Sequence, residues 1–382
     1  MKFPTNAWRG IFQDYLDAVG PSTEAPEEFH FSNFMVVAGF MLVRQAYIEN
    51  PTAAYFNFAV MNIGETGRER KTTAQSLARK LLPDPIPATW ITDLGGVASG
   101  EGILDALKDN DAATGHVGLM TVDELSALLR KSQQRGSTLT EFLIQLLDGT
   151  TPLRLAVRSN PVSCTDSLIT ISANATPGSL VDNVSEEIIL GGLINRFLVF
   201  YAKATNIIPN PKAPDRVKLD HIRKRLWALS QTNHGAIHLS PHAEATWDTH
   251  YKSRMGRPSI CDIERAVSAR TELHIRRLAG LYAVLEGTGN VTDDQLQAAI
   301  AVGLYCESAG IDLMREISGT RDARMENRIL GLIRVSGGSM KRRDLHQKLG
   351  GRVSGEKLIR LLRGLEDVGR VVRAGTDIKI YP

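Results

Sequence analysis

Two short segments contain residue types that can do chemistry, and the first is a glycine-containing loop that ends in a lysine. The loop spans residues 64–73 (GETGRERKTT), between a strand-like and a helix-like stretch. In such a loop, successive backbone N–H groups and the N-terminus of the following helix can converge on phosphate oxygens. Lys71 would then contact the terminal phosphates, and the Thr72 hydroxyl would bind a magnesium ion. The residues expected to bind a nucleotide here are Gly64, Thr66, Gly67, Arg70, Lys71 and Thr72.

The glycine spacing of this loop departs from the usual pattern. Counted back from Lys71, the positions where glycine is usual hold Glu65 and Arg70, and Gly64 stands one residue too early. A glycine-containing turn that merely precedes a helix is therefore the alternative interpretation of the segment.

The second segment is an apolar stretch that ends in two acids, residues 117–124 (VGLMTVDE). Asp123 would hold the magnesium ion, directly or through water. Glu124 would orient and polarise the attacking water, which is the general-base role in hydrolysis. A strand that ends in Asp-Glu is common by chance, but the loop and the acidic pair in this order together favour ATP and Mg²⁺ as ligands.

Two further polar residues stand at strand boundaries downstream. Asn174 ends the apolar stretch 168–174, where a sensor side chain would lie between the acidic strand and the γ-phosphate. A turn-forming Asn is the alternative. Arg196 stands at the start of another strand, from which it could reach the γ-phosphate of a neighbouring subunit and stabilise transition-state charge. A surface or salt-bridged arginine is the alternative there.

The elements that must position these residues alternate between strands and helices. Strands are expected at 55–61, 89–92, 117–122, 168–173 and 197–201, and helices at 71–82, 101–108, 124–131 and 139–147. This alternation predicts an α/β core with a mostly parallel sheet and helices on both faces. Two helices, at 8–19 and 31–47, are expected before it. A mainly helical region is expected after the break at 206–211.

Composition limits the class of protein. The chain has 382 residues, 43% hydrophobic and 23% charged, and no stretch of eighteen uninterrupted apolar residues. These values are typical of a multi-domain soluble protein without a membrane span. Three scattered cysteines fit a reducing compartment, and no secretory signal is readable, so we expect a cytoplasmic protein.

The last sixty residues differ in charge from the rest of the chain. Residues 323–382 contain fourteen Lys and Arg against six Asp and Glu, a net charge of +8, which leaves −5 on the first 322 residues. Helices are expected at 324–335, 341–349 and 354–368, followed by a hairpin, which is a winged-helix order. We therefore expect DNA as partner, held mostly through phosphates. A protein-interaction module is the alternative. The candidate DNA contacts are Lys341, Arg342, Arg343, Arg352, Lys357, Arg360 and Arg363.

Several motifs, in their order along residues 8–315, resemble a phage and prophage family of unknown function that is similar to the helicase part of primase-helicases. The motifs are EAPEEFH (24–30), RKT (70–72), SGEGI (99–103), DE (123–124) and GGLINRF (191–197). The resemblance implies a ring-forming ATPase of the AAA+ or RecA-like type, a homo-oligomer with a hexamer as the candidate ring. It also makes Arg70 before the loop lysine a family trait.

The same resemblance implies that the helical region after residue 215 is a lid. A helix at 270–280 in this region would offer Arg276 or Arg277 as a second sensor on the nucleotide. The period of the helix does not decide which of the two faces the phosphates, and a solvated helix face is the alternative.

Together these features predict four parts: an N-terminal helical segment (1–50), a P-loop ATPase core (51–206), a helical lid (207–320) and a winged-helix DNA-binding domain (323–382). The expected function is a DNA-dependent ATPase, a helicase, translocase or replication initiator of a phage or mobile element. The rival is a non-hydrolysing or nucleotide-switched DNA-binding regulator with a degenerate loop. An ATP-dependent defence or partition protein would share the motor and differ in its partner.

Overall fold

The computed structural model describes the whole chain except residues 50–52, 93, 95–98, 109–114, 135, 150–152, 156–161, 185–187, 189–190, 257–260, 350–352, 375–376 and 381–382. By internal contacts the chain divides into two compact units, Met1–Leu313 and Met314–Pro382. None of the helices in the described part combines the length and the apolar character needed to cross a lipid bilayer.

The centre of the first unit is a five-stranded sheet in which every pairing is parallel. Its strand order is β4-β5-β8-β3-β9, so β3 lies between β8 and β9, the last two strands of this sheet in the sequence. The α/β class with a parallel sheet is therefore confirmed. The strands are β3 (Ala59–Ile63), β4 (Trp90–Ile91), β5 (Val117–Val122), β8 (Leu168–Ala175) and β9 (Phe197–Tyr201).

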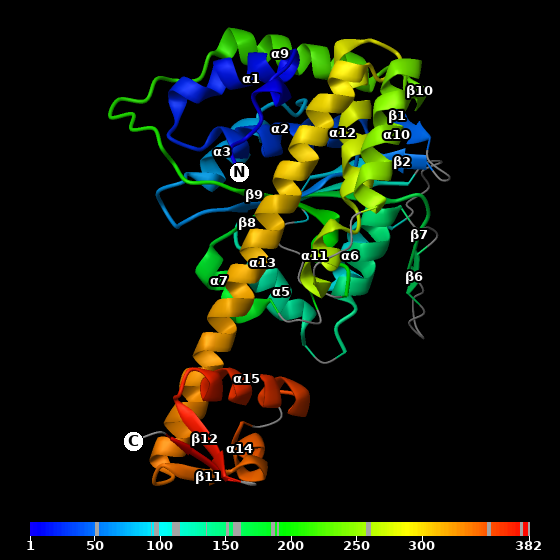
Figure 1. Ribbon diagram of the computed structural model, residues 1–382. Helices are drawn as coiled ribbons and strands as arrows, with labels where there is room; N and C mark the ends of the chain where they lie inside the picture. The colour runs from blue at the N-terminus through cyan, green and yellow to red at the C-terminus, as the bar shows by residue number, and fades with distance from the viewer. Residues whose placement is uncertain are drawn as a thin grey trace. The chain divides into compact units, whose positions relative to one another are not determined.

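Helices cover both faces of this sheet (Figure 1). On one face lie α2 (Glu27–Leu42) and α3 (Lys71–Arg79), and on the other α5 (Leu125–Ser132) and α6 (Leu139–Asp148). The approach of α2 is close, because a Cβ at Gly39 would lie 2.4 Å from the carbonyl oxygen of Phe56. Two short helices, α4 (Gly100–Ala106) and α7 (Pro177–Asn183), pack against α6 and α5, respectively.

Two expected elements have different bounds. The helix expected at 31–47 ends at Leu42, and a strand, β1, begins at Ala46. The apolar run 55–61 is not one strand, because β2 ends at Tyr55 and β3 begins at Ala59. Between them the chain turns, with the Phe58 N–H donating to the Phe56 carbonyl oxygen at 3.1 Å. Hydrophobicity alone could not locate that turn.

The helical region after β9 shares its apolar core with the N-terminal helices and the sheet, within the same compact unit. The division of this unit at residues 50 and 206 stays a prediction. A small sheet of order β10-β1-β2 joins the two parts of the chain. The remaining elements of the unit are η1 (Thr5–Ala7), α1 (Ile11–Val19), η2 (Gly20–Ser22), β1 (Ala46–Glu49), β2 (Ala53–Tyr55), β6 (Leu153–Leu155), β7 (Val162–Cys164), η3 (Ile194–Arg196), α9 (Arg216–Ser230), β10 (Gly235–Ile237), α10 (Pro241–Met255), α11 (Asp262–Ser268) and α12 (Thr271–Glu286).

The second unit packs three helices against a three-stranded antiparallel sheet of order β11-β13-β12, around its own apolar core. Its first helix is the end of α13 (Asp293–Val335), which also supplies the first unit. The expected start of the second helix at Lys341 is off by one, because Lys341 ends a strand and caps the helix. The other elements are β11 (Ser339–Lys341), α14 (Arg342–Lys348), α15 (Gly355–Asp367), β12 (Val371–Ala374) and β13 (Asp377–Ile380).

Candidate functional site

The parallel sheet brings the glycine-containing loop and the acidic pair to the same end of the molecule's central layer. The loop follows β3 and the acids follow β5, with β8 paired between these strands. All three strands end here, so we call this the carboxyl end of the sheet. The Gly64 N–H donates to the Ala175 carbonyl oxygen at 3.2 Å, which ties the start of the loop to the end of β8. The carboxyl end is where open α/β sheets bind ligands.

Inside the loop, the Lys71 side chain folds back on its own backbone. Its Nζ donates to the carbonyl oxygens of Gly64 and Glu65, the latter at 2.9 Å. Partial burial lowers the pKa of Lys71, and the nearby carboxylates of Glu69, Glu124 and Glu65 oppose that shift. Lys71 and Glu124, 53 residues apart in sequence, are therefore within electrostatic reach of each other.

The loop backbone accounts for the displaced glycine. A Cβ at Gly64 would lie 3.0 Å from the Glu69 side chain and 3.2 Å from the Ala202 carbonyl oxygen, so the position has little room for a side chain. Arg70, in the place where glycine is usual before the lysine, adopts φ 48°, ψ 34°, the left-handed region that glycine favours. The loop thus reaches this turn without glycine, and the Arg70 guanidinium lies 3.6 Å from the Glu24 carboxylate.

The acidic pair is accessible, and Glu124 is held in place. Asp123 and Glu124 are both exposed. One Glu124 oxygen accepts from the Ser126 N–H at 3.4 Å, capping α5, and from the Ser179 hydroxyl at 2.9 Å. The sequence interpretation missed Ser179, although the Thr176-Pro177 step that starts α7 with a capping box could have indicated a helix start beside the acids.

Oxygen donors suited to magnesium are present at this end of the sheet. The exposed Thr72 lies in the first turn of α3, and Asp123 follows β5. Magnesium is usually held by one or two such oxygens together with substrate phosphates. Within the described residues, no group of three or more His, Cys, Asp or Glu could hold a metal alone.

Asn174 is buried at the end of β8. It is 1% exposed, and its amide accepts from Asn62 at 3.3 Å and donates to Gln75 at 3.5 Å. Because Gln75 lies one turn after Lys71 on α3, this bond links Asn174 to the helix that follows the loop. The direct contact of Asn174 with a nucleotide stays a prediction.

Asn174 belongs to a buried polar network that the sequence interpretation missed. The network joins β3 and β8 to α2 and α3, and its shortest bonds include Ser32 to Asn62 and Ser172 to Asn33, both 2.6 Å. Its sequence signal is the polar residue at every second position of an apolar strand, Thr170, Ser172 and Asn174, which indicates a polar stripe on one face.

Arg196 lies at the opposite end of the sheet. It immediately precedes β9, at the end where the parallel strands begin, which we call the amino end. Its guanidinium pairs with the Asp148 carboxylate at 2.6 and 3.1 Å. The structure therefore does not bring Arg196 to the loop of its own chain. Contact with a neighbouring chain's nucleotide would require this pair to open.

The two candidate sensors of α12 are also not brought to the loop. The Arg276 guanidinium stacks on the Trp247 ring, 5.0 Å from its centroid, beside a surface pocket of about 390 Å³. Arg277 points elsewhere: it is 7% exposed and lies within electrostatic reach of Arg196 and Asp148 at the amino end. A contact of Arg277 with the same chain's loop nucleotide does not fit that position.

The candidate DNA-binding residues of the second unit fall into two sets. Lys341, Arg342 and Arg343 are exposed at the start of α14. On α15, by contrast, Lys357 and Arg360 share Asp322 at 3.2 and 3.6 Å. Arg363 is exposed, and Arg352 lies outside the described residues. The uncompensated positive charge is therefore greater on α14 than on α15.

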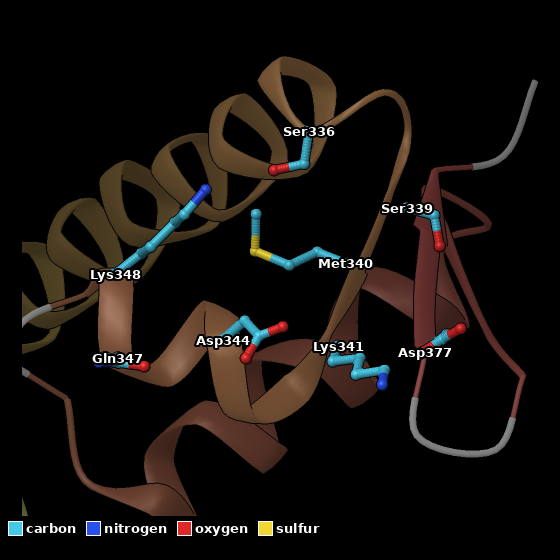
Figure 2. Close-up of a pocket in the computed structure, with 8 residues that line it drawn as sticks. All are labelled: Ser336, Ser339, Met340, Lys341, Asp344, Gln347, Lys348 and Asp377. Carbon is cyan, nitrogen blue, oxygen red and sulfur yellow. The ribbon is translucent and has the colours of Figure 1, made fainter.

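A surface pocket of about 690 Å³ adjoins the α14 set (Figure 2). The residue that follows α13 lines it, together with residues of β11, α14 and β13, and two acids stand among the basic residues. Its lining is Ser336, Ser339, Met340, Lys341, Asp344, Gln347, Lys348 and Asp377. The mixed charge of this lining does not by itself indicate a ligand.

The sequence was compared with models of known protein families and with curated proteins. No family model matches the chain, and no curated protein matches it in sequence. The functional argument therefore depends on the residues and geometry described above.

Proposed function

We propose that the protein is a DNA-dependent ATPase with a P-loop-type nucleotide site at the carboxyl end of its sheet. The observation that carries the proposal is the parallel β3-β8-β5 pairing, because the loop strand and the acidic strand then end at the same edge of the sheet with only β8 between them. The electrostatic effect of Glu124 on Lys71 is consistent with this placement. Residues so far apart in sequence have no local reason to meet at one end of a sheet.

In this proposal the residues divide the work of hydrolysis. The Lys71 ammonium exchanges its two loop carbonyls for phosphate oxygens, which are stronger acceptors because they are charged. Glu124, held by Ser179, accepts a proton from the attacking water. Magnesium, when bound to Thr72, Asp123 and the phosphates, would neutralise charge that develops on the leaving group.

The test is phosphate release from ATP, with and without DNA, by two variants. We expect Lys71→Ala and Glu124→Gln each to lower the rate by about a hundredfold or more, because each removes a charge-stabilising or proton-accepting group. Glu124→Gln should keep nucleotide binding, since the amide still caps α5. The matched controls are Lys80→Ala, just after α3, and Glu141→Gln, on α6, two exposed positions that should leave the rate unchanged. Undiminished activity in both site variants would remove the assignment.

The DNA part of the proposal depends on the second unit. Its three helices and antiparallel hairpin support a winged-helix assignment, and its net charge of +8 over residues 323–382 favours a polyanion. A helicase, translocase or replication initiator of a mobile element combines such a module with an ATPase. An oligomeric ring, with Arg196 contributed to a neighbour's site, completes the proposal.

The exposed charges predict which helix contacts the DNA backbone. We expect the double variant Arg342→Gln/Arg343→Gln to lower DNA affinity and to reduce the slope of log affinity against log salt by about two, one for each lost phosphate contact. The matched pair Arg360→Gln/Arg363→Gln should change the slope less, because Asp322 already shares the charge of Arg360. Fluorescence anisotropy with a duplex at several salt concentrations measures both. A larger change of the salt slope in the α15 pair would mean that α15, and not α14, contacts the DNA backbone.

A nucleotide-switched DNA-binding regulator is the second candidate. It is favoured by one observation, the Lys71 ammonium bonded to two loop carbonyls, which closes the loop on itself. The two candidates differ in one measurement. A regulator binds ATP without releasing phosphate, and its DNA affinity differs between the ATP-bound and nucleotide-free states.

A further inference from the structure

We propose that the amino end of the sheet contains an oxyanion-binding site, formed by Arg196, Arg270 and Arg277 and designed for a phosphate group. The three arginines come from segments far apart in sequence, the turn before β9 and the start of α12. Arg196 and Arg270 pair with Asp148, the last residue of α6, and Arg277, seven residues after Arg270, lies within electrostatic reach of the same carboxylate. The Asn57 side chain donates to the neighbouring Leu147 carbonyl oxygen at 2.7 Å, which ties the end of α6 to the segment before β3.

Arg277 is the residue that reveals the site. It is 7% exposed, and its Nε is buried without a hydrogen-bond partner among the described residues. Burial, with the repulsion of Arg270 and Arg196, lowers the pKa of Arg277 to about 10. A buried guanidinium without an acceptor is costly, so such groups are normally paired.

Among the described residues, Asp148 is the one carboxylate that pairs with this cluster, and the other two arginines already use both of its oxygens. Arg270 donates to them at 2.7 and 3.0 Å, and Arg196 at 2.6 and 3.1 Å. Within the described part of the chain, three positive charges thus face one negative charge. The missing partner is an acceptor with more oxygens and more charge than one carboxylate, which describes a phosphate.

Uncharged groups also surround the three arginines. The Nε2 of His274 bonds to the Asn195 carbonyl oxygen at 3.0 Å, and its Nδ1 is buried without a partner. Arg196 also donates to the Gly192 carbonyl oxygen. Within the described residues, Asp148 is the one carboxylate that acts on Arg277, so an incoming anion meets one competitor there.

A phosphate group could come from two sources. One is free phosphate or a small phosphorylated ligand. The other is the nucleotide bound at the carboxyl end of a second copy of this chain, and this source alone rests on the proposed function. A chain with a hydrolytic carboxyl end and a cationic amino end can join head to tail, which is the geometry of rings.

The first experiment measures phosphate binding in the Lys71→Ala background, which disables the loop as a competing site. Calorimetry and thermal unfolding are followed as phosphate is added to a buffer whose only small anion is chloride. We expect saturable binding and a rise in Tm. Adding Arg277→Met should weaken phosphate binding about tenfold or more, while adding Arg225→Met, on α9, should not. No saturable response in the background protein overturns the proposal.

The stability of Arg277→Met without phosphate separates a ligand-binding arginine from a structural one. Methionine fills similar space and removes an unpaired buried charge, so the variant should unfold at the same or a higher temperature than its parent. A marked fall in Tm would show that the guanidinium stabilises the fold by itself, and would overturn the proposal. As a local readout, phosphate should shift the NMR ring signals of His274 and leave those of His30, buried on α2, unchanged.

The second experiment identifies the source by subunit mixing. Lys71→Ala lacks a working loop, and Arg277→Met lacks the cationic site. If the phosphate belongs to a second copy's nucleotide, a mixture of the two inactive variants regains ATP hydrolysis, because some interfaces join two intact halves. If mixing restores nothing while phosphate binding persists, the ligand is free phosphate. Phosphate binding needs no hydrolysis, so failure of the ATPase proposal and failure of this one are distinguishable.

Discussion

The two ends of the central sheet hold their charges in opposite ways. At the carboxyl end, the acids Asp123 and Glu124 are exposed, and the lysine beside them is bonded to its own loop. At the amino end, three arginines are largely buried around Asp148. Exposed charges cost little to keep, whereas a buried cluster with excess positive charge persists only if something repays its desolvation.

This difference indicates which end depends on its charges for folding. Asp148 stabilises the fold, because its carboxylate compensates the positive charges of two partly buried arginines, Arg196 and Arg270. Asp123 does not, and its exposure leaves it available to a ligand. In a head-to-tail assembly the two ends would be complementary, an acidic hydrolytic surface facing a cationic one, and each chain would need its neighbour to complete a site.

The sharpest way to break this comparison is to neutralise one aspartate at each end. We expect Asp148→Asn to lower the free energy of unfolding by about 3 kcal/mol, because Arg196 and Arg270 then lack a counter-charge in a partly buried place. Asp123→Asn should change stability by no more than about 0.5 kcal/mol, while abolishing Mg²⁺-dependent hydrolysis. Chemical denaturation of both variants, at equal ionic strength, measures the contrast.

Phosphate provides the control for that experiment. If the loss in Asp148→Asn comes from unpaired arginines, added phosphate should restore more stability to this variant than to the unmodified chain. Equal losses at the two ends, or a loss that phosphate does not reduce, would mean that Asp148 stabilises the fold for another reason, such as its place at the end of α6.

The sequence was most informative where a local pattern decides the structure. β5 and β9 have the bounds expected from their apolar runs, and α3 begins at Lys71 as expected, because a loop before it and a periodic apolar face after it are both local signals. The same patterns predicted the parallel sheet. The ends of elements were less predictable, as the helix that stops at Leu42 illustrates. The residues that follow it pair as β1 with β10, a strand almost 190 residues away, and no local pattern indicates that pairing.

The site was predictable only in its residue types. The sequence named Lys71, Asp123, Glu124 and Arg196, and their places before or after expected parallel strands already assign them to opposite ends of the sheet. Which strands lie next to one another follows from the strand order, which is not a local property. The burial of Asn174 could not be foreseen either, because it depends on Gln75 one turn into α3. The Arg270-Asp148 pair spans 122 residues and has no pattern that marks it.

A smaller effect should distinguish the amino end by its response to acid. Burial, with repulsion from Arg277, lowers the pKa of His274 from 6.5 to about 3 in the folded protein. Between these values the unfolded chain binds more protons than the folded one, so stability is lost as the pH falls below about 6.5, by about 2 kcal/mol at pH 5 from this residue. His274→Gln can keep the bond to the Asn195 carbonyl and should remove that share of the pH dependence, whereas His221→Gln, on an exposed face of α9, should not. Urea unfolding at pH 7.5 and pH 5 measures the change.

Because His30 is also buried and its pKa is lowered to about 4, some acid sensitivity should remain in both variants. An unchanged pH dependence in His274→Gln would show that the imidazole is not kept neutral by the cationic amino end.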